Sequence, residues 1–170
     1  MNTQVGKRNS GFGPFSILGL SLVLFFFAFL AVMPKSGLQV RTRPTPQTPK
    51  KIAIVNDDID RLDTIGEYIE SFMVGYIPVP FIDCPSLIAA MDGGQRFQAY
   101  AVDLNMPGVN GLECTSMIIH RHPEAVVIGN SMIDDWQKEE VELLFKNRGA
   151  KGFNQGTSRG LIDLLRSLGL

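Results

Sequence analysis

From residue 51 to the end of the chain, short apolar runs alternate with stretches of helical periodicity, and the alternation recurs five times. The first run is KIAIV, and apolar residues follow it at spacings of three and four, on one helix face: Ile59, Leu62, Ile65 and Ile69. Repeated strand–helix units favour a parallel sheet, because right-handed crossovers place the helices on its two faces. The sequence therefore predicts an α/β domain over residues 51–170, with a five-stranded, doubly wound parallel sheet.

The other four strands are predicted from apolar runs bounded by turn residues. These runs are YIPVPFI (76–82), QAYAV (98–102), EAVVIG (124–129) and AKGFNQ (150–155). Helical stretches are expected after Pro85, Gly111, Asp134 and Thr157. The fourth helix carries an apolar stripe that is expected to face the core: Trp136, Val141, Leu144 and Phe145.

Residues 15–33 form a run of nineteen residues without a charge, preceded by a tail at 1–14. As a helix this run would be about 28 Å long, close to the hydrocarbon thickness of a bilayer. A cleaved signal peptide is one alternative, but its apolar core is usually about 7–15 residues and is followed by a small-x-small cleavage site. A buried helix of a soluble protein is the other. We expect a single transmembrane helix.

Basic residues on the two sides of this segment predict its orientation. Two precede it, Lys7 and Arg8, whereas five follow it: Lys35, Arg41, Arg43, Lys50 and Lys51. The side richer in basic residues faces the cytoplasm, which predicts a single-pass protein of the inner (cytoplasmic) membrane with residues 51–170 in the cytoplasm. The connecting stretch 34–50 contains four prolines and is expected to be a semi-rigid, extended linker.

Charge is distributed unevenly along the chain. Residues 1–50 carry six Lys or Arg and no acidic residue, and the remainder carries ten basic against 17 acidic residues. An acidic domain argues against nucleic acid as a partner, while a basic stretch beside an apolar one suits anionic membrane lipid. The two cysteines, Cys84 and Cys114, have no metal-ligand spacing, so free thiols in a reducing compartment are expected.

Acidic and amide side chains follow two of the predicted strands. Asn56, Asp57 and Asp58 come directly after the first strand, and Asp103 closes the third. In a flavodoxin-like sheet of order 2-1-3-4-5 these strands are neighbours, and their carboxyl ends border one crevice. Two carboxylates brought together repel unless a cation lies between them, and hard oxygen ligands favour Mg²⁺. A Mg²⁺ site at Asp57 and Asp103 is therefore expected.

Three motifs together resemble those of the response regulator receiver domain of two-component phosphorelays. They are the acidic cluster after the first strand, DLNMPGVNGLE after the third, and GAKGF at the fifth, and the resemblance covers residues 51–170. It implies that Asp103 is the phosphoacceptor, that Asp57 binds Mg²⁺ directly, and that Asn105 binds it through its backbone carbonyl. It also implies a histidine kinase or phosphotransfer protein as the donor, and a downstream protein as the receiver of the signal.

The resemblance further implies two switch residues. Ser131 matches the hydroxyl residue that follows the acyl phosphate, although Asn130 is an alternative at this position and Ser131 is also a plausible helix N-cap. Phe153 matches the aromatic residue that turns inward on activation, and a plain core aromatic is the alternative interpretation.

The sequence departs from the family at two positions. Asn56 stands where the first acid is usual, which removes one negative charge from the metal site. The lysine expected at the end of the fifth strand is absent, and Gln155 or Gly156 occupies its place. Lys151 does not replace it, because it precedes this position by four or five residues, roughly 13–16 Å along a strand.

These features predict a membrane-anchored receiver without an output domain, which accepts a phosphoryl group on Asp103 and signals by conformational change rather than as a turnover enzyme. The main alternative is a pseudo-receiver that docks a partner without phosphorylation. A third hypothesis is a Mg²⁺-dependent phosphatase, but Asn105 stands where such enzymes have an aspartate as general acid.

Overall fold

The computed structural model describes residues 48–170, which contain a five-stranded parallel sheet of order β2-β1-β3-β4-β5. The strands are β1 (Lys50–Val55), β2 (Tyr76–Phe81), β3 (Ala99–Val102), β4 (Val126–Asn130) and β5 (Gly152–Asn154). The predicted strand order and the predicted α/β class are confirmed. The proposed segment at 15–33 and most of the proposed linker lie outside the described residues, and within 48–170 no helix is both long and apolar enough to cross a membrane.

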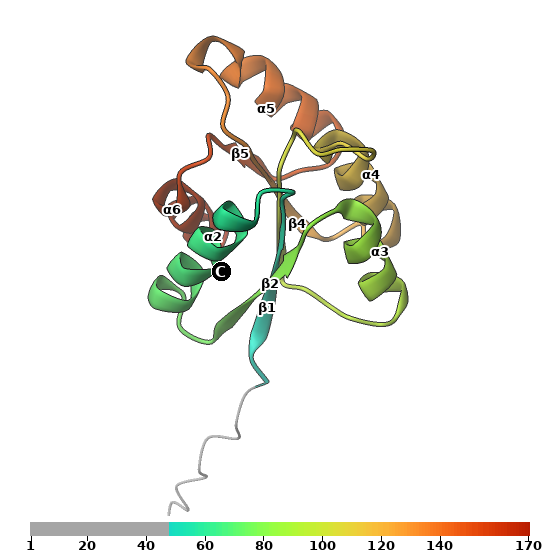
Figure 1. Ribbon diagram of the computed structural model, residues 1–170, viewed down its shortest axis with the longest axis vertical. Coiled ribbons are helices and arrows are strands. Elements are labelled where there is room, and N and C mark those ends of the chain that lie inside the picture. The colour runs from blue at the N-terminus through green and yellow to red at the C-terminus, as the bar shows by residue number, and fades with distance from the viewer. Residues whose placement is uncertain (1–47) are drawn as a thin grey trace, which may run out of the picture. The chain divides into compact units, whose positions relative to one another are not determined.

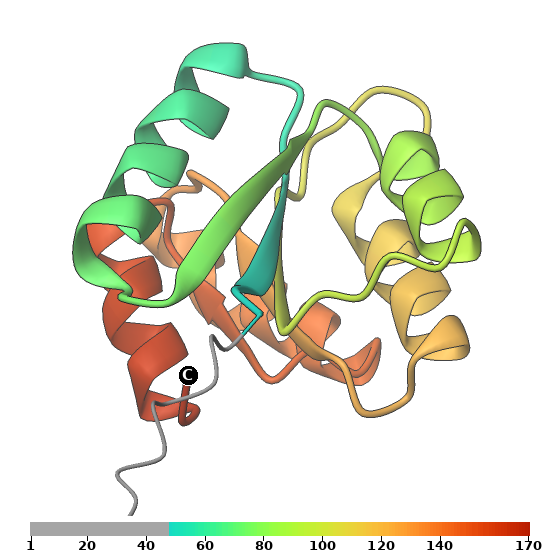
Figure 2. The same ribbon diagram turned by 90° about the horizontal axis from the view of Figure 1, so that it is seen from below.

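The helices cover both faces of the sheet. They are α2 (Ile59–Phe72), α3 (Cys84–Asp92), α4 (Gly111–Arg121), α5 (Lys138–Asn147) and α6 (Ser158–Ser167), and a short 3-10 helix, η1 (Asp135–Gln137), precedes α5. Figures 1 and 2 show α2 and α6 side by side on one face, and α3, α4 and α5 on the other. This is the doubly wound arrangement that right-handed crossovers produce.

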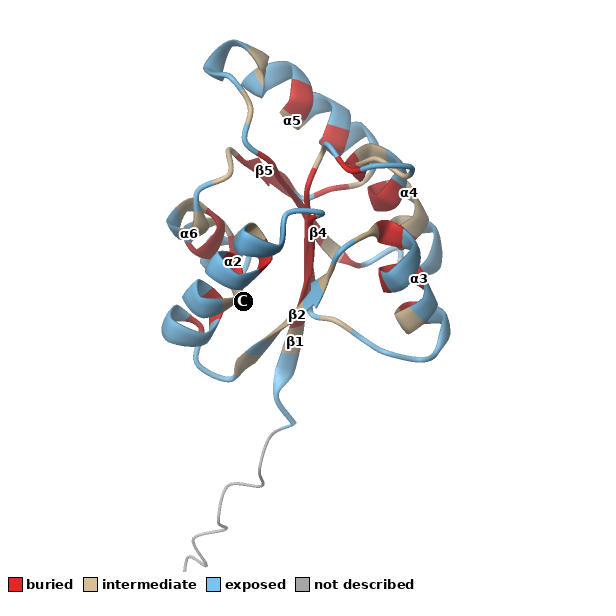
Figure 3. Cartoon of the chain, viewed as in Figure 1, coloured by how far each residue is buried: buried red, intermediate tan, exposed pale blue. Residues whose placement is uncertain are grey.

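Each face of the sheet carries its own apolar cluster, because successive strand residues point to opposite faces. In β1, Ala53 and Val55 contribute to the cluster under α3, α4 and α5, whereas Ile52 and Ile54 contribute to the cluster under α2 and α6. Figure 3 shows the central strands largely buried, with exposed residues on the outer sides of the helices, in the loops and at the start of β1. The continuous apolar run of β1 is typical of a parallel strand covered on both faces.

The region after β4 differs from the predicted helix. A helical stretch begins after Asp134 as expected, but its first turn is η1, and the α-helix starts only at Lys138. Val141 and Phe145 are buried as predicted, whereas the Trp136 side chain is 76% exposed and Leu144 is 41% exposed. The core prediction is therefore wrong for half of the stripe. Trp136 lies in η1, which does not continue the buried face of α5, and Leu144 lies at the border of that face, beside the buried Phe145.

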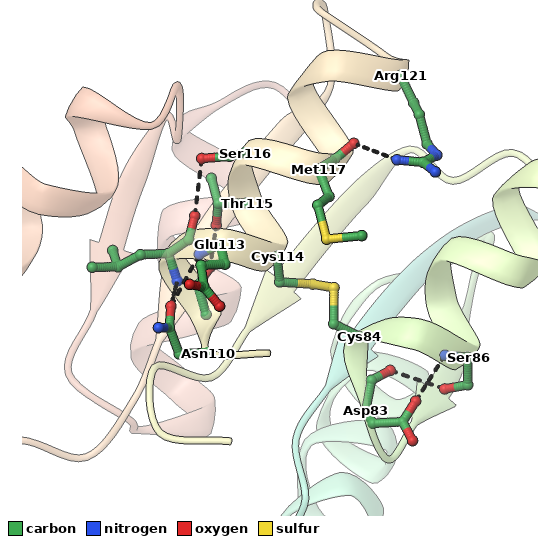
Figure 4. Close-up of a disulfide and its surroundings, with 12 residues drawn as sticks. Asp83, Cys84, Ser86, Asn110, Glu113, Cys114, Thr115, Ser116, Met117 and Arg121 are labelled. Atoms are coloured by element: carbon green, nitrogen blue, oxygen red, sulfur yellow. Dashed lines mark hydrogen bonds between the residues drawn. A yellow bond between two sulfur atoms is a disulfide. The ribbon is translucent and has the colours of Figure 1, made fainter. Parts of the chain in front are cut away.

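The two cysteines form a disulfide, so the expectation of free thiols is wrong. Cys84 opens α3 and Cys114 lies in the first turn of α4, with a Cα–Cα distance of 5.7 Å (Figure 4). Both side chains are fully buried. The two cysteines are thirty residues apart, and nothing in the sequence indicates that they pair. Their contact arises only when α3 and α4 pack side by side on one face of the sheet.

Candidate functional site

The carboxyl group of Asp103 lies at the end of β3, where the sheet meets the loop before α4. The Asp103 backbone N–H donates to the carbonyl of Val55 at 2.9 Å, which places the residue beside the end of β1. Its side chain is only 7% exposed, and its Oδ2 accepts a hydrogen bond from the Asn105 backbone N–H at 2.8 Å. Burial raises the pKa of Asp103, while hydrogen bonds from Ser131 and Asn105 and the charge of Arg61 lower it.

Asp57 lies near enough to Asp103 for its charge to raise the pKa of that carboxyl group. The predicted convergence of the two acids is thus present, with Asp57 exposed and Asp103 buried. The other members of the predicted cluster have structural contacts. The buried Asn56 side chain accepts a hydrogen bond from the Asp58 backbone N–H at 2.8 Å, and Asp58 accepts from the backbone N–H groups of the first turn of α2 as its N-cap.

The donor set at this site suits a hard cation. Asp57 and Asp103 offer carboxylate oxygens, and the loop after Asp103 offers the Asn105 carbonyl, so every available donor is an oxygen, as Mg²⁺ prefers. Within residues 48–170 no group of three or more His, Cys, Asp or Glu side chains comes together. Asn56, next to Asp57, carries an amide and adds no negative charge to the donor set. The residues therefore fit Mg²⁺ with reduced charge.

The loop from Asp103 to α4 is held by backbone contacts that require glycine. Gly111 donates its N–H to the Leu104 carbonyl at 2.9 Å, and a Cβ at Gly111 would overlap the Asp103 carbonyl. Asn110 caps α4 by accepting from the N–H groups of Leu112 and Glu113, each at 3.0 Å. These contacts bring the first turn of α4 against the backbone of Asp103, so the loop geometry is set by packing at both ends.

The two candidate switch residues lie on the other side of Asp103. Ser131 is buried, and its hydroxyl lowers the pKa of the Asp103 carboxyl group, whereas Asn130 accepts a hydrogen bond at 2.6 Å from Asn154, its neighbour across β4 and β5. Of the two alternatives, Ser131 is therefore the residue at the site. Phe153 is buried and packs against Phe145, with ring centroids 5.6 Å apart, which matches a core aromatic in this conformation.

The positions proposed for the missing lysine have different environments. The Gln155 amide donates to the Ile133 carbonyl at 3.0 Å and to the Asp135 carboxylate at 2.6 Å, toward η1. Gly156 adopts a left-handed conformation with φ +73°, and a Cβ there would lie 3.0 Å from the Met132 nitrogen and 3.1 Å from an Arg61 nitrogen. Gly156 is thus the position next to the groups that surround Asp103.

Arg61 is the site residue that sequence reasoning missed. It comes from the first turn of α2, its Nη2 donates to the Gly156 carbonyl at 3.2 Å, and its positive charge lowers the pKa of Asp103. The usable signal was its place in the first turn of the helix predicted to follow the acidic cluster, close to the carboxyl end of β1.

No protein-family model matches the sequence, and no curated protein matches it. Solved structures do match. The BeF3-activated receiver domain of DrrB has 22% identity and a TM-score of 0.58, with 69% of this chain and 95% of that chain covered. CheY4 of Vibrio cholerae has 19% identity and a TM-score of 0.59, with 69% and 97% covered. A chain of the CheX–CheY–BeF3–Mg²⁺ complex from Borrelia burgdorferi has 20% identity and a TM-score of 0.61, with 72% and 90% covered. Residues 48–170 therefore have the fold of a response regulator receiver domain.

Proposed function

We propose that this protein is a phosphorelay receiver that accepts a phosphoryl group on Asp103 from a histidine kinase or a phosphotransfer protein. The observation that carries the proposal is the environment of Asp103 at the end of β3. Its carboxyl group is buried and accepts a hydrogen bond from Asn105, and Ser131 and the charges of Asp57 and Arg61 shift its pKa. The Asn105 contact alone would also suit a turn aspartate. Burial together with the nearby charges of Asp57 and Arg61 suits a nucleophile that must be oriented and charge-balanced.

In the proposed reaction an Asp103 carboxylate oxygen attacks the phosphorus of a phosphohistidine. The phosphorus–nitrogen bond breaks, the imidazole nitrogen leaves with the electron pair and takes up a proton, and an acyl phosphate forms on Asp103. The Asn105 N–H orients the carboxylate by holding Oδ2. Mg²⁺ bound by Asp57, Asp103 and the Asn105 carbonyl would neutralise charge on the carboxylate and phosphoryl oxygens.

The proposed output is a conformational change that begins at Ser131 and extends to Phe153. Ser131 N–H donates to the Asn154 carbonyl at 3.3 Å, so a movement of Ser131 toward an acyl phosphate pulls on the end of β5, next to Phe153. A change of this kind alters the surface formed by η1 and α5, where a downstream protein would bind. It requires no turnover of substrate, so we do not propose an independent enzyme.

The location of the domain is a separate part of the proposal. We infer from the uncharged segment 15–33 and the basic residues after it that the chain is anchored in the inner membrane, with the receiver in the cytoplasm. Membrane lipid is then a partner of residues 15–33, and the acidic domain has no nucleic-acid partner.

A docking module that works without phosphorylation is the second candidate. Two observations favour it: Asn56 replaces a carboxylate, and no lysine occupies position 155 or 156. Exposed apolar side chains on η1 and α5 offer a surface for binding, with Trp136 76%, Leu143 59% and Leu144 41% exposed. In this function Asp103 would contribute only to the local structure.

Intact-mass measurement after incubation with acetyl phosphate and Mg²⁺ separates the two functions. We expect the full-length protein to gain one phosphoryl group, and Asp103→Asn to gain none. Asp58→Asn is the matched control, because Asp58 caps α2 and asparagine caps a helix equally well. Absence of mass gain in the parent, with normal signalling by Asp103→Asn in cells, would leave the docking module as the function.

A further inference from the structure

Phosphorylation would replace the single negative charge of the Asp103 carboxylate by the two of an acyl phosphate, in a site that already holds Asp57. The carboxyl group it is attached to is buried, so solvent screens the added charge poorly. No lysine follows β5, and the side chain of Gln155 is turned toward Ile133 and Asp135. The site therefore needs a cation from another element.

Arg61 is the cationic side chain that the fold brings to this place. Its Nη2 donates to the Gly156 carbonyl at 3.2 Å, and Gly156 in turn lies against the backbone of Met132, the residue after Ser131. Ser131 and the charge of Arg61 both lower the pKa of Asp103, which places the guanidinium and the serine on the same side of the site as the carboxyl group. A guanidinium has five N–H donors in a planar fork, and one of them is enough for the Gly156 carbonyl.

One donor of this guanidinium has no acceptor. The Arg61 Nε is buried and makes no hydrogen bond, and in the described part of the chain the Tyr100 hydroxyl is the only other buried side-chain polar atom of this kind. Buried donors are nearly always paired, because leaving one unpaired costs about 1–3 kcal/mol. Tyr100 lies inside the apolar cluster under α3 and α4, whereas Arg61 lies beside the acidic site. An anion at the site would supply the missing acceptor.

We propose that Arg61 binds the phosphoryl oxygens of phosphorylated Asp103. A residue of α2 would then supply the positive charge that no residue after β5 provides. This inference rests on the proposed phosphorelay function and deepens it. Gly156 is part of the same arrangement, since a side chain at this position would occupy the space next to the Arg61 Nη2. The ligand class is a tetrahedral, phosphoryl-like anion attached to a carboxylate.

A purely structural role for Arg61 is the competing explanation. In that case the hydrogen bond to Gly156 only holds the β5–α6 loop, and its loss would disturb binding of a cation and of an anion alike. If Arg61 is an anion-binding residue, its replacement weakens anion binding but strengthens Mg²⁺ binding, because a positive charge next to two carboxylates has been removed. The opposite signs separate the two roles.

The experiment measures binding of two probes to the full-length protein, beryllofluoride in the presence of Mg²⁺ by ¹⁹F NMR, and Mg²⁺ alone by calorimetry. The variants are Arg61→Gln and Arg61→Lys. Arg96→Gln is the control, since Arg96 is exposed in the α3–β3 loop, at the amino end of β3 and away from the site, and its side chain donates only to the carbonyl of Gln95. Circular dichroism checks that each variant is folded.

We expect Arg61→Gln to bind beryllofluoride roughly 10- to 100-fold more weakly, the range for loss of a charged hydrogen bond. Arg61→Lys should lose less, Arg96→Gln should match the parent, and Arg61→Gln should bind Mg²⁺ more tightly. Equal beryllofluoride affinity in the parent and Arg61→Gln, or a parallel weakening of both probes, would overturn the assignment while the phosphorelay function stands. A parent that binds no beryllofluoride and gains no phosphoryl group would remove both.

Discussion

Asp103 is a buried acid whose carboxyl group is held by specific contacts at the end of β3. It has two hydrogen-bond donors, yet desolvation is the largest influence and its pKa is raised above the ordinary value of 3.8. Because the folded-state pKa lies above the unfolded-state value, burial costs nothing when the group is protonated and costs most when it is ionised. The site therefore lowers the stability of the domain at neutral pH.

We predict that Asp103→Asn is more stable than the parent at neutral pH in the presence of a chelator. The gain should be full above the folded-state pKa, shrink as the pH falls through it, and vanish below the unfolded-state pKa. Its full size is roughly 1.4 kcal/mol for each pKa unit between the folded and the unfolded state. Urea unfolding across this pH range measures it. Asp92→Asn is the control, because the hydrogen bond from Arg121 lowers the pKa of the exposed Asp92, so its replacement should bring no gain in stability at neutral pH. A parent and an Asp103→Asn protein of equal stability at every pH would contradict the prediction.

Restoring a lysine after β5 is predicted to fail at Gly156. A side chain there must adopt a left-handed backbone, which costs about 1–2 kcal/mol, and its Cβ meets Met132 and Arg61. The new ammonium would also lie next to the Arg61 guanidinium. Gly94→Lys is the matched control, since Gly94 has φ +92° and a Cβ added there would meet no atom within 4 Å. We expect Gly156→Lys to lose at least about 1 kcal/mol more than Gly94→Lys in urea unfolding. Equal losses would show that the space is not restricted.

Residue roles were predictable where they depend on the position along a strand, and not where they depend on packing between distant segments. The convergence of Asp57 and Asp103 follows from strand order alone. The contact of Arg61 with Gly156 joins residues 95 positions apart, and no periodicity in the sequence signals it. The N-cap role of Asp58 had a local signal, an acid just before a helical pattern, which the grouping with Asp57 obscured.

Among the elements, the strands were the most predictable. Every predicted strand is present with its ends displaced by up to two residues, since apolar runs bounded by turn residues define them well. The YIPVPFI run shows why proline did not prevent this. Its two prolines lie in β2, an edge strand, where they are two residues apart and point their ring nitrogens to the same side, away from the ladder with β1.

Helices α3 and α4 are linked at both ends, by a disulfide at one end and an ion pair at the other. The disulfide was not predictable from the sequence. The disulfide joins their first turns, and Arg121 near the end of α4 makes two hydrogen bonds to Asp92 at the end of α3, at 2.9 and 3.2 Å. The disulfide is buried and the ion pair is exposed. Since exposed ion pairs contribute little, the covalent link should dominate the stability of this pair of helices.

We predict that Cys84→Ala combined with Cys114→Ala lowers the free energy of unfolding by about 3–4 kcal/mol, the loop-closure value for a thirty-residue separation. A reductant should lower the stability of the parent under unfolding conditions and leave the double variant unchanged. Asp92→Asn, which removes the other link, should change stability little. If the native parent reacts with two equivalents of a thiol reagent before unfolding, the two cysteines are free and the prediction is wrong.

At the scale of the whole domain, topology brings the site together. The order β2-β1-β3-β4-β5 places the carboxyl ends of β1, β3 and β4 side by side, so Asp57, Asp103 and Ser131 meet although they lie far apart in the sequence. On one face of this sheet α2 packs beside α6, which is why Arg61 reaches Gly156 in the loop before α6. A different strand order would separate these residues without changing any local structure.

The last prediction concerns the placement of the whole chain in the cell. If residues 15–33 anchor the protein and the basic residues after them remain inside, carbonate washing should leave the chain in the membrane fraction, and protease added outside intact cells should leave residues 51–170 undigested.

Disulfides are uncommon in a reducing cytoplasm, but exchange requires access of a thiolate to sulfur, and both cysteines are fully buried. We therefore expect alkylation of native membranes to label neither cysteine, and reduction after unfolding to expose both. Digestion from outside would place the receiver on the oxidising side of the membrane, beyond the reach of a cytoplasmic phosphodonor, and would contradict both the orientation and the phosphorelay function.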